Sequence, residues 1–438
     1  MPCRQFCAVT CMPIRIKAPE EWGIERVPAS HRVMGKLDFF VLWSSLGVGL
    51  LVLQAGQFLT MPGEAYGFGF GMLDAALIAL VGSVIGSLLL ALAGVVGERE
   101  GVPTMVSLRP SFGLFGSYLP TILNIIQLIG WTTFEIIIMG DAAESISGIE
   151  GSGPIWIVFF GVLAILMAVW GPLRVVREWL EKFAIWLVYL STIYITYSLL
   201  SSGVELPLYS GSNLSTYLLA LDLVIAMPIS WMPLVSDYNR FSRGYGEGFK
   251  GTFVGYTTSN FWFYTLGAAL YFIYPGETVV RSIATLFFGQ LALLLILVDE
   301  TDNAFADVYS ASVSLQNIND RIGRHIYVAA VGIVSIILGL TIPIVEYENF
   351  LLLIGASFVP VVSILLADYF IVKGGRYSDA ELYSDSGVKL PALVTWVIGF
   401  VAYYYFAYIY QVIGATLPSF ITTFLVYSIL GKVLGVVR

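Results

Sequence analysis

Charged side chains are scarce in this chain of 438 residues. Lys, Arg, Asp and Glu make up 12% of it, whereas a soluble domain carries roughly 25%. Hydrophobic residues make up 58%, and apolar stretches of about 20 residues, the length that crosses a bilayer as a helix, recur along the whole sequence. The composition leaves no room for a soluble or nucleic-acid-binding domain. It predicts an all-α membrane protein.

Histidine and cysteine are rare as well. The two histidines, His31 and His325, lie in predicted cytoplasmic regions, so no imidazole is available within the bilayer for acid–base chemistry or zinc binding. The three cysteines, Cys3, Cys7 and Cys11, all lie in the N-terminal arm without further ligands for a metal. We therefore expect no enzyme activity, no cofactor and no obligate protein partner, although an intramembrane aspartyl-type enzyme or a non-transporting sensor remains open.

The apolar stretches predict twelve transmembrane helices. If the N-terminus is cytoplasmic, every Lys and Arg except Arg281 lies on the cytoplasmic side, which is the bias of membrane proteins with positive inner loops. We therefore predict a plasma-membrane protein with both termini in the cytoplasm and the lipid bilayer around it. The predicted spans are 37–57, 72–96, 118–141, 155–172, 184–201, 215–235, 252–274, 283–312, 326–344, 350–372, 391–411 and 416–436.

Two of the spans contain helix-breaking residues near their middle. Span 1 has two glycines within 44–49, and span 6 has two prolines within 227–233. Gly and Pro are common in membrane helices, but breaks five spans apart also indicate the binding site of a transporter built from inverted repeats. This spacing predicts an N-terminal arm (1–36), a ten-helix core (37–372) with repeats of about 37–201 and 215–372, and two further helices (391–438).

Acidic residues occur where lipid would be expected. Glu135 lies in the middle of span 3, and span 8 carries a strip of acceptors without any Lys or Arg. Each ionisable group within a span costs at least ~2.5 kcal/mol on insertion scales, so these groups need a wet or protein interior. Such a strip suits protons or a hard cation such as sodium. The strip consists of Asp299, Glu300, Asp302, Asn303 and Asp307.

Two tryptophans lie close to these features. Trp131 precedes Glu135 by four residues, which places both on one face of a helix, and Trp231 follows Ser230 inside the span 6 break. Tryptophan often anchors a helix at the membrane surface. A planar heterocycle could instead stack between the two indoles, a contact worth ~1–3 kcal/mol per base, while the carboxyl group of Glu135 binds its N–H edge.

Several stretches resemble the nucleobase:cation symporter-1 family, especially its hydroxymethylpyrimidine and cytosine permeases. The resemblance runs from span 1 to the end of span 10 and is carried by 101–103, 109–113, 116–120, 124–132, 230–240 and 307–311. It implies a ten-helix inverted-repeat core plus two helices, and uptake of a nucleobase-like solute driven by Na⁺ or H⁺. An amino-acid or other small-solute symporter of the same fold is the alternative. A metal carrier is disfavoured, because span 1 lacks Asp-Pro-Gly.

The resemblance also implies which residues bind. The implied substrate contacts are Trp131, Glu135, Gly49, Ser230, Trp231, Asn303 and Asp307. The implied sodium ligands are the backbone carbonyls of Ser45, Val48 and Val298 and the side chains of Thr301 and Asp302. Three positions depart from the hydantoin carriers of the family: Gly49 replaces a glutamine, Glu135 replaces an amide, and Asp302 replaces a hydroxyl residue.

Overall fold

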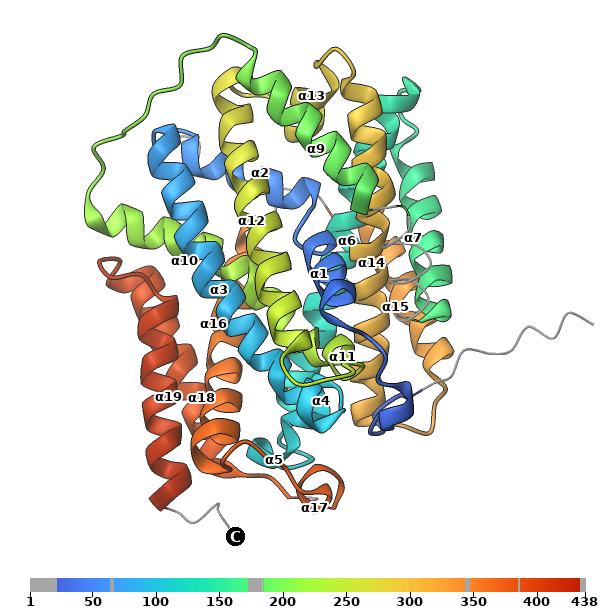
Figure 1. Ribbon diagram of the computed structural model, residues 1–438, viewed down its shortest axis with the longest axis vertical. Helices are drawn as coiled ribbons and strands as arrows, with labels where there is room; N and C mark the ends of the chain where they lie inside the picture. The colour runs from blue at the N-terminus through green and yellow to red at the C-terminus, as the bar shows by residue number, and fades with distance from the viewer. Residues whose placement is uncertain are drawn as a thin grey trace, which may run out of the picture.

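The computed structural model describes residues 22–63, 67–171, 183, 185–342, 347–384 and 387–433. Long helices run between two ends of one bundle (Figure 1), with α5 (Arg109–Phe112) and α17 (Asp379–Tyr383) at one end and α13 (Val279–Ala284) at the other. Some residues considered in the sequence lie outside the described ranges, namely Cys3, Cys7, Cys11, Arg174, Arg177 and Lys182.

The described helices follow the predicted spans in order. The long helices are α1 (Lys36–Ser45) with α2 (Leu50–Thr60), α3 (Met72–Glu100), α6 (Tyr118–Ser147), α7 (Gly153–Trp170), α9 (Ile185–Leu200), α10 (Leu214–Trp231), α12 (Glu247–Ile273), α14 (Gly289–Ile318), α15 (Arg324–Gly339), α16 (Tyr347–Leu366), α18 (Leu390–Tyr404) and α19 (Thr416–Val433). Short segments connect or extend them: η1 (Ala29–His31), α4 (Thr104–Ser107), η4 (Met232–Leu234), α11 (Val235–Asn239), η6 (Ala367–Val372) and η7 (Tyr405–Ile409).

Seven helices of the described chain are long and apolar enough to cross a membrane, and the bent α1–α2 pair makes an eighth. Helices α9 and α15 are apolar but only 16 residues long. Helices α12 and α14 have 27 and 30 residues but are more polar, and α14 carries the acidic strip. The fold is therefore that of an all-α, multi-pass membrane protein, as the sequence predicts.

Glycines let the helices of the core approach closely. A Cβ atom on Gly86 of α3 would lie 2.3 Å from the Pro228 ring of α10. On α12, a Cβ atom on Gly267 would lie 2.0 Å from the backbone oxygen of Leu53 in α2. Without a hydrophobic driving force between helices in lipid, close packing at small residues holds membrane bundles together. The same contacts fix α1, α2 and α10 around the candidate site.

The predicted break of span 1 is present. Helices α1 and α2 are separated by four residues and bent by 61° relative to each other. The close approach of α12 contributes, because a Cβ atom on Gly47 would lie 2.2 Å from the Ser259 hydroxyl oxygen. The sequence therefore predicted this feature correctly.

Span 6 is less interrupted than the sequence suggests. Helix α10 continues through Pro228 and only tightens into the 3-10 turn η4 before α11. Two side-chain hydrogen bonds hold the turn around Pro228. Gln127 donates to the carbonyl oxygen of Ser230 at 3.0 Å, and the Ser230 hydroxyl donates to that of Met227 at 2.6 Å. The prolines therefore tighten this helix rather than unwind it.

The boundary of span 8 was also predicted wrongly. The predicted span of 283–312 includes the end of α13, which is a separate short helix, and α14 begins at Gly289. The turn is tight: a Cβ atom on Gly289 would lie 1.9 Å from the carbonyl oxygen of Ile283. Hydropathy cannot detect such a turn, because its residues are as apolar as those of the helix.

Candidate substrate and ion site

The acidic strip of α14 lies against the break between α1 and α2. The Ser45 hydroxyl donates to Asp299 Oδ1 at 2.6 Å, and Asn303 Nδ2 donates to the carbonyl oxygen of Val48 at 2.9 Å. The backbone N–H of Leu50, the first residue of α2, lies 3.2 Å from both carboxyl oxygens of Glu300. Backbone groups freed by the break are thus bound by the strip, and a carboxyl group is favoured at a helix N-terminus.

Gly49 makes this contact possible through its size. A Cβ atom at this position would lie 3.3 Å from Glu300 Oε1 and 3.4 Å from Asn303 Nδ2. Its φ of 165° is ordinary extended backbone, so conformational freedom is not the reason for glycine. Glu300 and Asn303 of α14 occupy the space that a glutamine side chain at this position would need.

The five predicted sodium ligands lie on the two sides of this contact. Thr301 Oγ1 donates to the carbonyl oxygen of Val298 at 2.8 Å, while Ser45 and Val48 already contact α14 as described above. Asp302 is fully buried, and neither of its carboxyl oxygens has a hydrogen-bond partner. A buried carboxylate without a hydrogen-bond donor is costly. A bound cation would supply the missing partner of Asp302.

This set fits a hard cation better than a transition metal. Within the described residues, no three His, Cys, Asp or Glu side chains gather as a metal site. The candidate ligands are instead carbonyl, hydroxyl and single carboxylate oxygens, which suit sodium.

Trp131 and Trp231 are both buried in the bundle, with 7% and 8% of their surface exposed. The Trp131 ring meets Phe350 of α16 edge-on at 5.6 Å between centroids, and Trp231 meets Trp43 of α1 edge-on at 6.4 Å. Neither indole therefore anchors a helix at the membrane surface, which was the alternative role considered for these tryptophans.

Glu135 and Asp307 complete the predicted substrate contacts. Glu135 is 4% exposed, and its Oε2 atom has no hydrogen-bond partner. Its carboxyl group lies beside that of Glu300. Asp307, two turns beyond Glu300 along α14, is 2% exposed. The structure thus brings Glu135 to the acidic strip, although the two belong to spans far apart in the sequence.

Sequence reasoning left out three residues of this region. Asp299 and Glu300 were recognised as members of the strip but given no place in the site, although they make its contacts to Ser45 and Leu50. Gln127, which binds the backbone of Ser230, was also missed. Its position one helical turn before Trp131 is the signal that could have indicated it.

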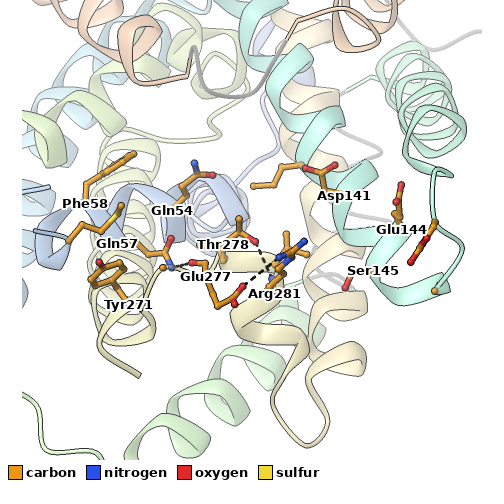
Figure 2. A pocket seen from close by; sticks show the side chains of 17 residues that line it. Gln54, Gln57, Phe58, Asp141, Glu144, Ser145, Tyr271, Glu277, Thr278 and Arg281 are labelled. Carbon is orange, nitrogen blue, oxygen red and sulfur yellow. Dashed lines mark hydrogen bonds and ion pairs between the residues drawn. The ribbon is translucent and has the colours of Figure 1, made fainter. Parts of the chain in front are cut away.

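A cavity of about 900 Å³ opens at the α13 end of the bundle. Gln54 and Gln57 of α2, Asp141 of α6 and Glu277 of the turn before α13 line it (Figure 2). The predicted substrate and ion residues do not line it. The cavity reaches α6 at Ile138, one turn beyond Glu135, so it forms a vestibule above the candidate site.

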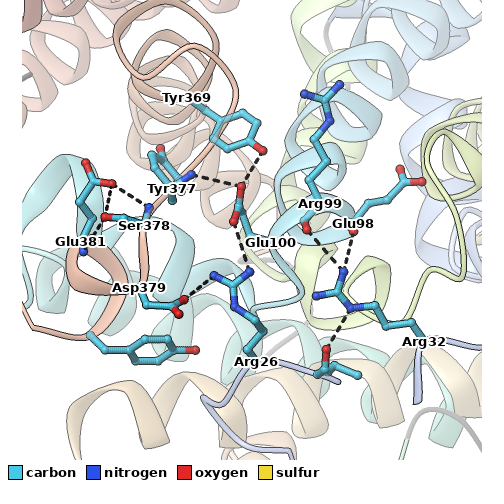
Figure 3. Close-up of polar contacts among 12 residues, drawn as sticks. Arg26, Arg32, Glu98, Arg99, Glu100, Tyr369, Tyr377, Ser378, Asp379 and Glu381 are labelled. Atoms are coloured by element: carbon cyan, nitrogen blue, oxygen red, sulfur yellow. Dashed lines mark hydrogen bonds and ion pairs between the residues drawn. The ribbon is translucent and has the colours of Figure 1, made fainter. Parts of the chain in front are cut away.

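The opposite end of the bundle is closed by polar contacts (Figure 3). Arg26 of the N-terminal segment contacts Glu100 of α3 at 3.4 Å and Asp379 of α17 at 2.8 Å. Glu100 also accepts a hydrogen bond from the Tyr369 hydroxyl at 2.9 Å, and the backbone N–H of Val27 donates to the carbonyl oxygen of Gly101 at 2.8 Å. These contacts tie the N-terminal segment to α3 and α17.

Comparison with known proteins identifies the family of this chain. The family model described as permease for cytosine/purines, uracil, thiamine, allantoin matches residues 26–428. A Bacillus subtilis protein named as a purine-cytosine permease is 25% identical over 392 residues, covering 84% of this chain and 83% of its own. A vitamin B6 transporter of Saccharomyces cerevisiae is 24% identical over 387 residues, covering 81% and 64%.

A solved structure shows the same fold. The nucleobase-cation-symport-1 family transporter Mhp1, in a closed conformation with bromovinylhydantoin bound, superposes with a TM-score of 0.78. The two chains are 17% identical, and the match covers 95% of this chain and 96% of the other. The family consists of transporters rather than enzymes. With a family model matching nearly its whole length, this chain belongs to the permeases for cytosine, purines, uracil, thiamine and allantoin, the nucleobase-cation-symport-1 transporters.

Proposed function

We propose that this permease imports a nucleobase-like heterocycle, such as cytosine or hydroxymethylpyrimidine, by symport with Na⁺ or H⁺ and alternating access. The observation that carries the proposal is the contact between the acidic strip of α14 and the break of span 1. There, buried carboxyl oxygens of Asp299 and Asp302 lack hydrogen-bond partners. Broken helices that expose backbone groups to coupling ions are typical of secondary transporters.

The substrate would bind between Trp131 and Trp231, with Glu135 at its polar edge. Ser230, Asn303 and Asp307 line the same region, and Gly49 leaves space for the approach of α14. A carboxyl oxygen without a donor, as on Glu135, favours a ligand that brings N–H groups of its own. An aminopyrimidine presents such an edge. The family description and the vitamin B6 relative indicate that this fold accepts several nitrogen heterocycles.

The coupling cation would bind at Asp302 and Thr301, with the backbone oxygens of Ser45, Val48 and Val298. The carboxylate of Asp302 adds a charge to a shell that is otherwise neutral. This charge favours tighter binding of Na⁺ and also allows a proton to take its place.

The orientation and repeat architecture belong to the same proposal. With both termini in the cytoplasm of a plasma-membrane protein, Arg281 of α13 lies outside, the vestibule faces outward, and the Arg26 contacts close the inner end. We infer that repeats of about 37–201 and 215–372 form the transport core and that 391–438 adds two peripheral helices. The state described by the structure is then outward-facing.

Uptake by intact cells tests the function. Cells that express the chain should accumulate labelled cytosine or hydroxymethylpyrimidine above the level of cells carrying the empty vector. Repeating the assay with sodium replaced by choline, and at two external pH values, distinguishes Na⁺ from H⁺ coupling. Absence of accumulation for every nucleobase-like solute tried, with the protein present in the membrane, contradicts the proposal.

A further inference from the structure

The acidic side chains around the proposed substrate site have no positively charged partner among the described residues. Ion pairs of the described residues lie instead at the two ends of the bundle, for example Arg26 with Glu100 and Arg281 with Glu277. None of the described ion pairs involves Glu135, Glu300 or Asp307. A ligand that carries positive charge would therefore meet acidic groups here, with no Lys or Arg of the described ion pairs competing for them.

Glu135 is the carboxyl group best placed to meet a ligand. It is 4% exposed, it lies one turn from Trp131, and no donor reaches its Oε2 atom. The neighbouring Glu300 already accepts from the backbone N–H of Leu50, so its environment is partly satisfied. Two carboxyl groups side by side repel each other unless they share a proton or positive charge is close, and a ligand at Glu135 can supply that charge.

The groups that face Glu135 from the surrounding helices reinforce this argument. Helix α14 contributes Asp302 and Asp307 in addition to Glu300, and helix α12 contributes the hydroxyl of Tyr256. Each of these is neutral or acidic. A ligand with a partial negative charge at its edge, such as a ring carbonyl, would meet only repulsion on this side.

The two indoles add an attraction of the same sign. The face of an indole ring carries negative partial charge, and Trp is the best aromatic partner for a cation, most of all when both are shielded from water. Trp131 and Trp231 are both buried in the bundle, with 7% and 8% of their surface exposed, so a cation between them would be shielded from water. A positively charged ring between them gains from both stacking and charge.

The vestibule continues the acidic pattern outward. Asp141, Glu144 and Glu150 line the cavity above the site, and Arg281 is the cation among its lining residues. Since Arg281 is paired with Glu277 at 3.9 Å, the remaining acids dominate. A cleft lined by one sign of charge concentrates ligands of the other sign.

We propose that this chain carries its heterocycle as a cation, with a positively charged ring N–H bound to Glu135. The inference rests on the proposed function, because it assigns a charge to the substrate of the same site. It extends that function by ranking neutral oxo-pyrimidines, cytosine among them, as weaker ligands than basic aminopyrimidines. Basic aminopyridines and aminopyrimidinium ions become the favoured class.

A matched pair of ligands tests the charge directly. At neutral pH 4-aminopyridine is a cation, whereas 4-pyridone presents the same ring N–H without charge. Binding of each to the purified full-length protein would be measured by titration calorimetry, together with labelled cytosine as the reference. We expect 4-aminopyridine to bind roughly 10- to 100-fold more tightly than 4-pyridone, as is typical of a hydrogen bond to a charged group.

Variants locate the charge effect. In Glu135→Gln the preference for the cation should fall to within about threefold, with 4-pyridone binding little changed, because the amide keeps an acceptor but no charge. Asp307→Asn should reduce the preference in the same direction. Asp222→Asn is the control, since this buried carboxyl group of α10 accepts from the backbone of Ala415 and Thr416, away from the site.

The outcomes separate the two proposals. If 4-pyridone binds as tightly as 4-aminopyridine, or if Glu135→Gln weakens both equally, the cation inference is overturned while nucleobase transport stands. If the protein binds cytosine but neither 4-aminopyridine nor 4-pyridone, the cation inference is likewise overturned and nucleobase transport stands. If folded protein binds neither probe and no nucleobase, the proposed function falls as well.

Discussion

At the scale of single residues, the account depends on side chains whose partners are missing inside the protein. Asp302 and Glu135 are almost fully buried, yet they have carboxyl oxygens without hydrogen-bond donors. Asp74, in contrast, accepts from the backbone and hydroxyl of Ser210 at 2.7 and 3.0 Å, and it holds a loop to α3. The missing donors at Asp302 and Glu135 are therefore a reason to regard them as candidate binding residues.

Replacing Trp131 by alanine should weaken substrate binding without unfolding the protein. Loss of one stacking contact costs ~1–3 kcal/mol, or roughly 5- to 150-fold in affinity. Binding of labelled cytosine to purified protein would be compared with its elution on size exclusion. Trp396→Ala is the matched control, because this indole on α18 donates to the carbonyl oxygen of Ser357 outside the site. Equal affinity in both variants would remove Trp131 from the site.

Asp302→Thr should change the response to sodium. Without the carboxylate the proposed cation shell loses its charge, so the sodium concentration for half-maximal uptake should rise by roughly tenfold. Asp74→Asn, which alters a buried acid outside the site, should leave the sodium response unchanged. An identical sodium dependence in Asp302→Thr and the unaltered chain would show that Asp302 is not part of the coupling site.

The sequence could indicate these residues because charge and indole groups are rare within spans. It could not indicate which of the acids would find partners. Asp299 is satisfied in part by Ser45 and Glu300 by Leu50, and these contacts depend on the angle at which α14 meets the break. That angle is set by packing between distant segments.

At the scale of elements, the break between α1 and α2 is the feature on which the site is built. The sequence predicted it, because glycines in a span are a local signal. It overestimated the break of span 6, because the helix continues through Pro228 in surroundings that include a contact distant in the sequence, from Gln127 to Ser230. Span 8 began later than predicted for a similar reason: an apolar turn precedes Gly289.

Larger residues at Gly49 should impair transport in proportion to their size. Because φ at this position is ordinary, the effect is purely steric: Gly49→Ala would require shifts of a few tenths of an ångström in Glu300 and Asn303, whereas Gly49→Val would push α14 away from the break. We expect partial uptake for alanine and at least tenfold less for valine, in keeping with the cost of overpacking.

The control for this series is Gly63→Ala, where a Cβ atom would meet nothing within 4 Å. Uptake of labelled cytosine, normalised to the amount of protein in the membrane, is the measurement. Full activity of Gly49→Val would show that the close contact between α14 and the break is dispensable.

The N-terminal segment should loosen when Arg26 is replaced by alanine. Its ion pairs to Glu100 and Asp379 are partly exposed, so each contributes only about 0.2–1 kcal/mol, and closure should weaken without loss of fold. Hydrogen exchange of residues 22–34 should become faster by up to roughly fivefold. Arg281→Ala, at the other end of the bundle, is the control, and unchanged exchange in Arg26→Ala would show that these pairs do not hold the segment.

At the scale of the whole molecule, the structure combines a vestibule at one end, closing contacts at the other, and an acidic site between them. The all-α membrane fold followed from hydropathy and from the family resemblance. The end of the bundle at which the cavity opens could not be predicted from the sequence, because one sequence encodes every conformational state of a transporter. On the proposed mechanism the permease alternates between states, and the structure describes one of them.

The most direct test of the central claim is accumulation by purified protein in liposomes. The liposomes would contain buffer of low sodium concentration at a fixed pH. Labelled cytosine or hydroxymethylpyrimidine would be added outside, together with an inward gradient of either Na⁺ or H⁺. The account predicts that one gradient drives accumulation above the external concentration, and that Trp131→Ala reduces it. If neither gradient drives any nucleobase-like solute above equilibrium, while the protein remains folded, the account is wrong.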